Sequence, residues 1–393
     1  MSMGEHINFK MQRRAILSSS CGLALALMAG GVGQAFASGR KVTLADIGVG
    51  DPGGDWSKYE KKTGNKVNLL SMGNAPSAVT NQLLAGGGLT SFDIINIVGG
   101  MQKPLVDNDL IHKLDTNKLT NWSSNTFIQK YLSKGTPGFD FIGYDGNVYG
   151  VPTILQGDSF AYLPDETGEL DSYGALFDPK FKGYVSLEDN YTTAGQKTAL
   201  YLKKSGLAKI SNPADMTPDE IKTVMDFLIE HKKKGQFRVI WSSFEQAVSL
   251  LTKKEVYVMD CWEPMVFVAN SQGHNTKYAS PKEGYLLWAM AAYIVKNPKR
   301  SKAELEDTYQ LLDFMLGPWY GAKISLLRGY MTNPGAINYA KTNSSEFTSE
   351  EAQKVESIIS GVADKFAFGG TWQNRWPKYV DVYEEEWQRF KSA

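Results

Sequence analysis

Two strand-like runs decide the fold of this chain: VYVMDCWEP at residues 256–264 and YLLWAMAAYIV at residues 285–295. Long apolar runs rich in aromatic and β-branched residues favour buried strands. We predict that the first strand presents Trp262 and Glu263 and ends at its final proline, because proline cannot donate to a strand ladder. We predict that the second is a long strand crossing from one lobe into another, with Trp288 at the crossing. Both tryptophans also fit ordinary core positions, since tryptophan is usually well buried.

Strands and helices alternate in the first part of the chain. Strands are predicted at 42–47, 67–72 and 92–98, with helices at 56–63 and 77–85. This order indicates a mostly parallel sheet flanked by helices, an α/β fold. Ligands of such sheets bind outside the carboxyl ends of the strands. The loops expected at that edge span residues 48–54, 71–76 and 98–101.

A first crossing into a second lobe is predicted for a strand at 154–162. In the second lobe, Thr217 and Glu220 fit the N-cap and third position of a capping box before an apolar-periodic run. The other elements predicted beyond the first crossing are a strand at 181–187 and helices at 193–204, 221–233, 244–251, 302–316 and 376–390.

Length and composition suit a soluble globular protein. The 393 residues are enough for two domains, and a hydrophobic fraction of 42% with a charged fraction of 21% is typical of globular chains. The formal net charge is zero, so no basic surface argues for a nucleic-acid partner. Aromatic residues make up 12% of the chain, which suits a site that stacks on small organic molecules and equally suits a large core.

The N-terminus is predicted to be a signal peptide, residues 1–37, that is removed on export to the periplasm. Arg13 and Arg14 precede an apolar stretch, and Ala35-Phe36-Ala37 offers small residues at the two positions that a signal peptidase recognises. The mature chain would begin at Ser38. The paired arginines resemble a twin-arginine signal, and a plain secretory signal fits equally well.

Motifs of enzymes and of metal or cofactor sites have little support. Residues 48–53, GVGDPG, match G-x-G-x-x-G, but Asp51 would repel a pyrophosphate and Pro52 removes an amide donor, so we expect no dinucleotide cofactor. The three histidines after residue 37 are far apart and one cysteine, Cys261, remains, so no metal site is expected. No G-x-S-x-G nucleophile motif occurs.

Acidic and aromatic residues at predicted strand ends and crossings form the candidate site. Aromatic faces attract a cation through the ring quadrupole, and desolvated carboxylates neutralise it. Each of these residues also fits a role in the core or at a helix cap, and it is their joint position beside the crossings that favours a site. The candidate ligand-binding residues are Asp158, Asp189, Trp262, Glu263, Trp288, Tyr330 and Gln373.

The chain resembles the periplasmic spermidine/putrescine-binding proteins of ABC importers along nearly all of the mature sequence. The resemblance rests on TGNKV at 63–67, FDII at 92–95, LDTNKLTN at 114–121, YGVP at 149–152, PKEG at 281–284, GY at 329–330 and WQN at 372–374. It implies a type II binding-protein fold, in which two α/β lobes joined by crossing strands close on the ligand like a hinge. It also implies that Trp262, Trp288, Tyr330 and Gln373 contact the ligand.

Two positions depart from the family pattern. The family has an aspartate two residues after the crossing tryptophan, where it anchors an amine, and this chain has Met290. The serine and tyrosine after the third strand are replaced by Val98-Gly99-Gly100. The expected ligand is a polyamine or another amine-bearing molecule, such as an amino-acid or sugar-amine conjugate. Its charge would then be met by Asp158, Glu263 or Asp189.

These observations predict a two-lobed solute-binding protein that delivers a small organic ligand to an inner-membrane ABC permease. The first lobe would comprise residues 38–157 and 286–393, and the second residues 158–285. We expect a monomer without a cofactor. The competing hypothesis is a secreted enzyme that uses Glu188-Asp189 or Asp158 as acid or base. The export signal and the lack of a nucleophile or cofactor motif favour binding.

Overall fold

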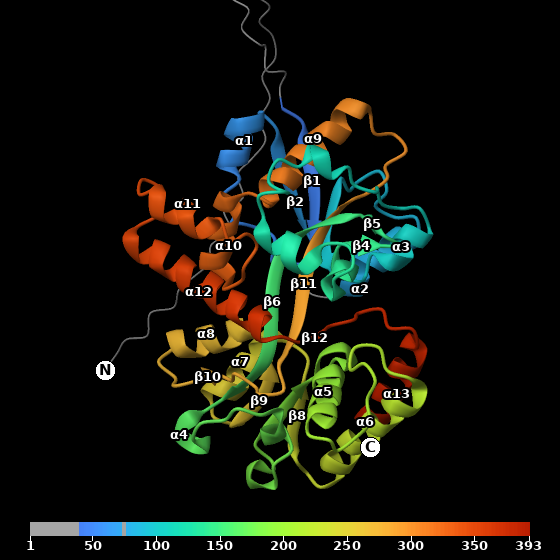
Figure 1. Ribbon diagram of the computed structural model, residues 1–393, viewed down its shortest axis with the longest axis vertical. Coiled ribbons are helices and arrows are strands. Elements are labelled where there is room, and N and C mark those ends of the chain that lie inside the picture. The colour runs from blue at the N-terminus through green and yellow to red at the C-terminus, as the bar shows by residue number, and fades with distance from the viewer. Residues whose placement is uncertain (1–38, 73–75) are drawn as a thin grey trace, which may run out of the picture. The chain divides into compact units, whose positions relative to one another are not determined.

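The computed structural model describes residues 39–72 and 76–393 (Figure 1). The predicted signal peptide lies outside the described residues, as does part of the loop expected at 71–76. The described chain alternates strands and helices and builds a continuous sheet with helices packed against it. The α/β fold class predicted from the sequence is therefore confirmed.

Ten strands share one sheet, and two more form a hairpin. The strands are β1 (Lys41–Asp46), β2 (Lys66–Ser71), β3 (Ile94–Val98), β4 (Gly143–Tyr144), β5 (Asn147–Val148), β6 (Gly150–Tyr162), β7 (Val185–Glu188), β8 (Phe237–Trp241), β9 (Val258–Cys261), β10 (Lys277–Tyr278), β11 (Tyr285–Ile294) and β12 (Gly370–Trp372). The sheet order is β2-β1-β3-β11-β6-β9-β7-β8, with β10 beside β6 and β12 beside β11, while β4 and β5 pair with each other. The pairs β1–β2, β1–β3, β7–β8 and β7–β9 are parallel.

The helices follow from local sequence rules. Gly64 ends α1 in the left-handed conformation at φ 75°, and Thr217 and Glu220 form the predicted capping box of α6. The helices are α1 (Ser57–Thr63), α2 (Pro76–Leu84), α3 (Lys103–Asp107), α4 (Pro164–Thr167), α5 (Gln196–Lys204), α6 (Pro218–Lys233), α7 (Phe244–Thr252), α8 (Glu263–Ser271), α9 (Lys302–Met315), α10 (Pro318–Arg328), α11 (Ala336–Thr342), α12 (Ser349–Phe368) and α13 (Val380–Ser392). Single turns of 3-10 or π helix occur at Thr116–Lys118, Ile128–Leu132, Pro137–Phe141, Tyr173–Leu176, Pro179–Phe181 and Tyr191–Gly195.

The long strands β6 and β11 are the two predicted crossings. They run antiparallel to each other through the middle of the sheet (Figure 1). Every residue of β6 is buried, and the strand passes from one apolar core, which contains Ile154, into a second, which contains Phe160. The strand β11 returns the chain to the first core, where it pairs with β3. Both crossing strands predicted from the sequence are confirmed.

The C-terminal helix α13 packs in the second core. Its side chains Tyr383, Trp387 and Phe390 are buried there, and Lys232 of α6 donates to the carbonyl oxygen of Phe390. The sequence analysis placed residues 286–393 with the first lobe, so this helix lies apart from the core predicted for it. An amphipathic pattern shows that a helix has a buried face, but not which core receives it. The lobe boundaries themselves stay a prediction.

The run at residues 256–264 differs from its prediction. The strand β9 ends at Cys261, and Trp262 is the N-cap of α8, a helix that the sequence analysis missed. Pro264 lies in the first helical turn, where its missing N–H would have had no partner in any case. The proline therefore begins a helix here, and it places Glu263 at the helix N-terminus. The predicted strand at 181–187 is likewise shorter, because residues Pro179–Phe181 form a 3-10 turn.

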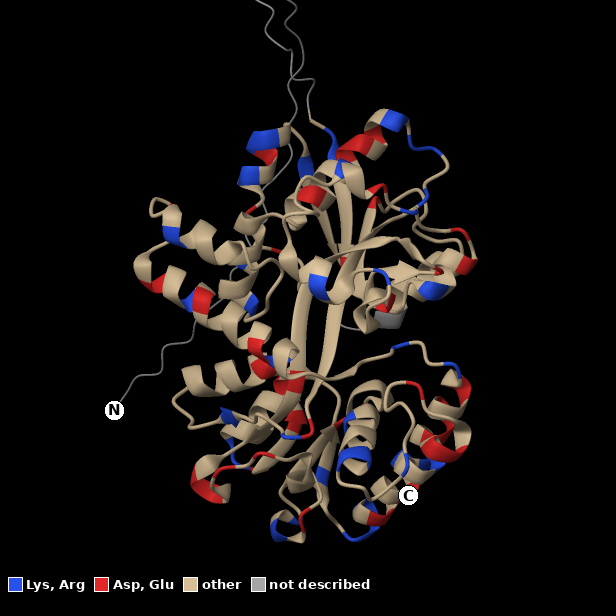
Figure 2. Cartoon of the chain, in the orientation of Figure 1, with Lys and Arg blue, Asp and Glu red and all other residues tan. Residues whose placement is uncertain are grey.

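Charged residues of both signs are interspersed along the surface elements (Figure 2). The helix α13 carries Glu384, Glu385 and Glu386 in succession. Within residues 39–72 and 76–393, no helix combines the length and apolar character that a membrane crossing requires.

Candidate functional site

The crossing strands bring Trp288 and Asp158 to the same part of the sheet. Trp288 on β11 lies opposite Gln156 on β6, and Asp158 lies opposite the residue two positions before Trp288. Trp288 is the one residue of β11 that is not fully buried. Its ring meets the ring of Tyr330 edge-on, with centroids 5.7 Å apart. Tyr330 follows Gly329, which ends α10 in the left-handed conformation. The structure therefore brings Trp288, Tyr330 and Asp158 together, and their role in ligand binding stays a prediction.

Asp158 is a buried carboxylate that lacks a full set of partners. Its side chain is 2% exposed, and its Oδ1 atom accepts no hydrogen bond from any described residue. Burial raises the pKa of Asp158 to about 6, although the Lys197 ammonium and the nearby Trp288 indole favour the ionised form. The indole nitrogen of Trp288 is also buried, and it lies outside hydrogen-bonding geometry to every other described residue. An indole N–H and a carboxylate oxygen thus lie side by side in a buried position, close enough for the indole to favour the ionised form of Asp158.

A second buried acid, Glu188, lies at the end of β7. Its carboxylate accepts a hydrogen bond of 3.1 Å from the indole Nε1 of Trp262. Burial raises the pKa of Glu188, and the negative charge of Asp260 raises it further. Trp262 is held from its other side by Trp241, whose ring meets it edge-on at 5.5 Å. Glu188 with Trp262 therefore resembles Asp158 with Trp288, since each is a buried acid beside a tryptophan indole.

The two acids share one buried cation, Lys197. This lysine of α5 is 1% exposed, forms an ion pair with Asp260 of β9, and donates to the carbonyl oxygen of Ser159 at 3.1 Å. Burial opposes its charge, but Asp260 and Asp158 outweigh this and raise the pKa of Lys197. Because Lys197 already pairs with Asp260, it neutralises neither Asp158 nor Glu188 by direct contact.

Glu263 is occupied within the protein. Its Oε2 atom accepts hydrogen bonds from Lys365 of α12 at 2.6 Å and from Gln156 at 2.8 Å. Lys365 also lies over the ring of Tyr278, 4.9 Å from its centroid. Glu263 was predicted to meet the charge of a ligand, and in this structure its charge is already met by Lys365.

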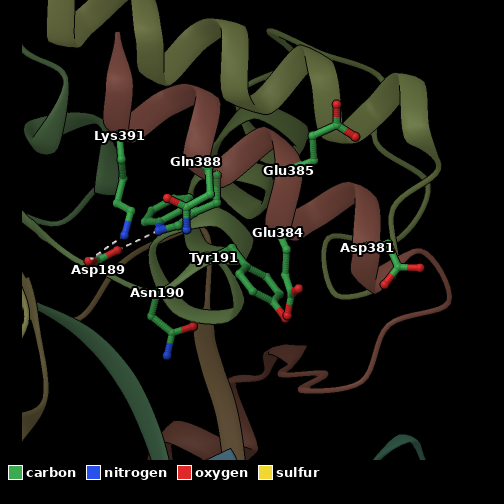
Figure 3. Close-up of a pocket in the computed structure, with 9 residues that line it drawn as sticks. Asp189, Asn190, Tyr191, Asp381, Glu384, Glu385, Gln388 and Lys391 are labelled. Atoms are coloured by element: carbon green, nitrogen blue, oxygen red, sulfur yellow. Dashed lines mark hydrogen bonds and ion pairs between the residues drawn. The ribbon is translucent and has the colours of Figure 1, made fainter.

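Asp189 lies apart from these side chains, in a pocket formed with α13. It accepts hydrogen bonds from the Trp387 indole at 2.8 Å and from Lys391 at 3.1 Å, and Figure 3 shows it facing Lys391. The pocket measures about 550 Å³, and Tyr191 and Glu384 also line it. Neighbouring residues of an extended chain point to opposite sides, so the adjacent acids Glu188 and Asp189 face different surroundings.

Gln373 follows β12, the short strand beside β11. Its backbone N–H donates to the carbonyl oxygen of Leu287, and its side-chain amide donates to the carbonyl oxygen of Thr192 at 2.9 Å. The side chain is 3% exposed, and its Oε1 atom has no hydrogen-bond partner in the described part of the chain. Gln373 thus ties the crossing strand to the second core and leaves one acceptor open.

The G-x-G-x-x-G loop is anchored by Asp46 at the end of β1. The Asp46 carboxylate accepts hydrogen bonds from the backbone of Gly48 and Gly50 and from the side chain of Asn96. Burial raises the pKa of Asp46 despite these donors. A Cβ at Gly50 would lie 2.4 Å from the Asn96 amide nitrogen, so only glycine fits there. The glycines therefore serve a tight loop at the carboxyl ends of β1 and β3.

A sequence-family model described as "bacterial extracellular solute-binding protein" matches residues 56–353. The chain belongs to this family. Solved structures with the same fold include the spermidine/putrescine-binding protein PotD of Streptococcus pneumoniae, with a TM-score of 0.69 and 16% identity over 90% of this chain and 99% of that one. Another is MotA of A. tumefaciens in complex with glucopine, with a TM-score of 0.65 and 19% identity over 89% and 99%. Among curated protein sequences, none matches the chain.

This solute-binding protein therefore has the two-lobed binding-protein fold of the solved structures and the solute-binding role of its family. The competing enzyme hypothesis is not favoured, because the family is described by solute binding and not by a reaction. Within the two described ranges, no group of three His, Cys, Asp or Glu side chains is arranged to hold a metal ion.

Sequence reasoning missed three cations of this solute-binding protein: Lys197, Lys365 and Arg375. Lys197 had a usable signal, because it interrupts the apolar face of a predicted helix. Lys365 had none, since its partner Glu263 is 102 residues away. Arg375 comes two residues after Gln373 and lies near Glu188, whose charge partly offsets the lowering of the Arg375 pKa by burial.

Proposed function

We propose that this solute-binding protein binds a small, amine-bearing organic molecule between the two cores and delivers it to an inner-membrane ABC permease. The observation that carries the proposal is the pair of buried acids beside tryptophans, Asp158 with Trp288 and Glu188 with Trp262. An ammonium group placed between them would restore the ionised form of each carboxylate and would lie against aromatic faces.

The buried Oδ1 atom of Asp158, which has no hydrogen-bond partner among the described residues, favours a cationic ligand group. A buried carboxylate without a partner is unfavourable and is kept where it serves a purpose. Asp158 takes the role that an aspartate at the position of Met290 has in the family pattern, from the neighbouring strand. Tyr330 and Gln373 border the same region and complete the proposed site. The similar structures include one protein named for spermidine/putrescine transport and two in complex with glucopine and agropinic acid, so proteins with this fold are associated with different small molecules.

Export and lobe closure are part of the same proposal. Residues 1–37 would direct export to the periplasm by either the Sec or the twin-arginine route and would be removed before Ser38. The mature protein would act as a monomer, and its two lobes would close on the ligand by bending at β6 and β11. A polyamine would fit the two acids as a dication, and an amine-bearing conjugate would fit them with one amine.

Calorimetry tests the proposal on protein freed of bound compounds by unfolding and refolding. Putrescine, spermidine, ornithine and lysine serve as amine probes, and at least one should bind. Asp158→Asn keeps the shape of the side chain and removes its charge, so it should weaken every bound probe by about 2–5 kcal/mol. Asp189→Asn is the matched control, because Trp387 and Lys391 hold that acid elsewhere, and it should bind as the wild type does. Equal affinities of Asp158→Asn and the wild type would contradict the site.

A further inference from the structure

Arg375 is a cation without a partner beside the proposed site. No hydrogen bond or ion pair joins its guanidinium to any other residue that the structure describes, and its Nε atom is completely shielded from solvent. The other arginines of the second core, such as Arg238 and Arg389, are ion-paired at the surface. Arg375 as a whole is half-buried, and it is the shielded Nε–H donor that is unfavourable unless something supplies an acceptor.

The backbone around Arg375 is fixed, so the position of this side chain is set by the fold. The Asn374 N–H donates to Gln196 at 3.1 Å, and the Gln196 amide donates back to the carbonyl oxygen of Asn374 at 2.8 Å. On the other side, a Cβ added at Gly100 would lie 3.6 Å from the Cβ of Arg375. Arg375 therefore belongs to a backbone segment that lies between the loop after β3 and the start of α5.

That loop is Val98-Gly99-Gly100, which departs from the family pattern. Gly100 has a φ of 96°, a conformation that favours glycine, and it brings bare backbone next to Arg375. Where the family pattern has a serine and a tyrosine, this chain has two glycines, and the second of them lies against an arginine. The two features lie together in space although they are 275 residues apart in the sequence.

The negative charges of Glu188 and Asp158 favour the charged form of Arg375, yet neither acid forms an ion pair with it within 4.0 Å. Each of these three groups thus lacks a direct partner of opposite charge among the described residues. An ammonium alone would satisfy the two acids and would leave the arginine unpaired and repelled. A ligand that carries both signs of charge would satisfy all three groups.

We propose that the ligand carries a carboxylate as well as an amine, and that Arg375 binds the carboxylate. The guanidinium fork matches a carboxylate with two parallel hydrogen bonds, which a lysine ammonium cannot reproduce. The amine would lie against Asp158 and Glu188, so this inference rests on the proposed function and narrows it. The ligand class is then an amino acid or an amino-acid conjugate, and simple polyamines are poor ligands.

Matched pairs of probes test the carboxylate separately from the amine. Ornithine is putrescine with one added carboxylate, and lysine stands in the same relation to cadaverine. Calorimetry on refolded wild-type protein should show at least one amino acid of the two pairs binding at least about 30-fold more tightly than its diamine, the ratio expected for a desolvated charge pair. Arg375→Ala should remove this preference, and Arg375→Lys should restore only part of it.

Control variants locate the effect. Arg238→Ala removes an exposed arginine and should keep the wild-type preference. Arg328 is another arginine whose Nε atom is shielded and unpaired within the described chain, and unlike Arg300, which also has such an Nε atom, it forms no ion pair with a described residue. If Arg328→Ala loses the preference for the amino acid and Arg375→Ala keeps it, the assignment to Arg375 is wrong.

The outcomes separate the two proposals. Diamines that bind as tightly as or more tightly than their amino acids overturn the carboxylate inference and leave the amine-binding function in place. If neither member of either pair binds, and the protein isolated from its native periplasm carries no compound with both an amine and a carboxylate, both proposals fail. Circular dichroism of each variant shows that a lost preference does not reflect unfolding.

Discussion

The ligand-free protein should lose stability as the pH rises, and Asp158→Asn should reduce that loss. The folded protein raises the pKa of Asp158 from its usual 3.8 to about 6 because the side chain is buried. Between these values the folded state holds a proton that the unfolded state has released. Stability therefore falls as the pH rises through this window, and the loss is complete above about pH 6.

The magnitude follows from the pKa difference. At 1.36 kcal/mol for each pKa unit, the gap from 3.8 to about 6 amounts to about 3 kcal/mol. About 2 kcal/mol of it falls between about pH 4.5 and about pH 7.5. The charges that face Asp158 are Lys197 and Lys365, which favour its ionised form, and Asp260, which opposes it. Their effects are already contained in the value of about 6.

Urea unfolding of the mature chain at both pH values measures this. Between them, the wild type should lose about 2 kcal/mol more free energy of unfolding than Asp158→Asn does. An amine ligand at saturating concentration should cancel the difference at the higher pH, because an ammonium beside Asp158 stabilises the carboxylate. Parallel pH dependences for the two proteins would refute the assignment of Asp158 as a buried, partly uncompensated acid.

Three further predictions concern other parts of the chain. Lys365→Met should lower the free energy of unfolding by about 1–2 kcal/mol, because it leaves the half-buried Glu263 carboxylate without its ion pair. The control Lys341→Met breaks an exposed ion pair and should change the free energy of unfolding by less than about 0.5 kcal/mol. Equal losses for the two variants would contradict this prediction. Trp387→Phe should cost about 1 kcal/mol through the lost hydrogen bond to Asp189 and leave ligand affinity unchanged. Intact mass of the exported protein should correspond to a start at Ser38.

Local patterns predicted the parts of the fold that depend on neighbouring residues. The apolar run at 285–295 predicted one long crossing strand, and it forms β11. The capping box at Thr217 depends on residues three positions apart, and both of its hydrogen bonds form. The run at 285–295 also predicted Trp288 on a crossing strand, and Trp288 lies on β11 opposite Gln156 of β6.

Contacts between distant residues could not be predicted in this way. Glu263 follows Trp262 in the sequence and was expected beside the ligand, yet Lys365 approaches from α12 and pairs with it. The strand run before Pro264 gave no indication that the proline opens a helix. Proline suits both a strand end and a first helical turn, and the packing of α8 against α7 decides between them.

We propose that an amine lies between Asp158 and Trp288, and a crystal structure of the protein with the compound that co-purifies with it tests this most directly. We expect electron density against the Trp288 ring, with a nitrogen of the ligand within hydrogen-bonding distance of the Asp158 carboxylate. Ligand density in the pocket of Asp189 and α13, with the space beside Asp158 empty, would contradict it.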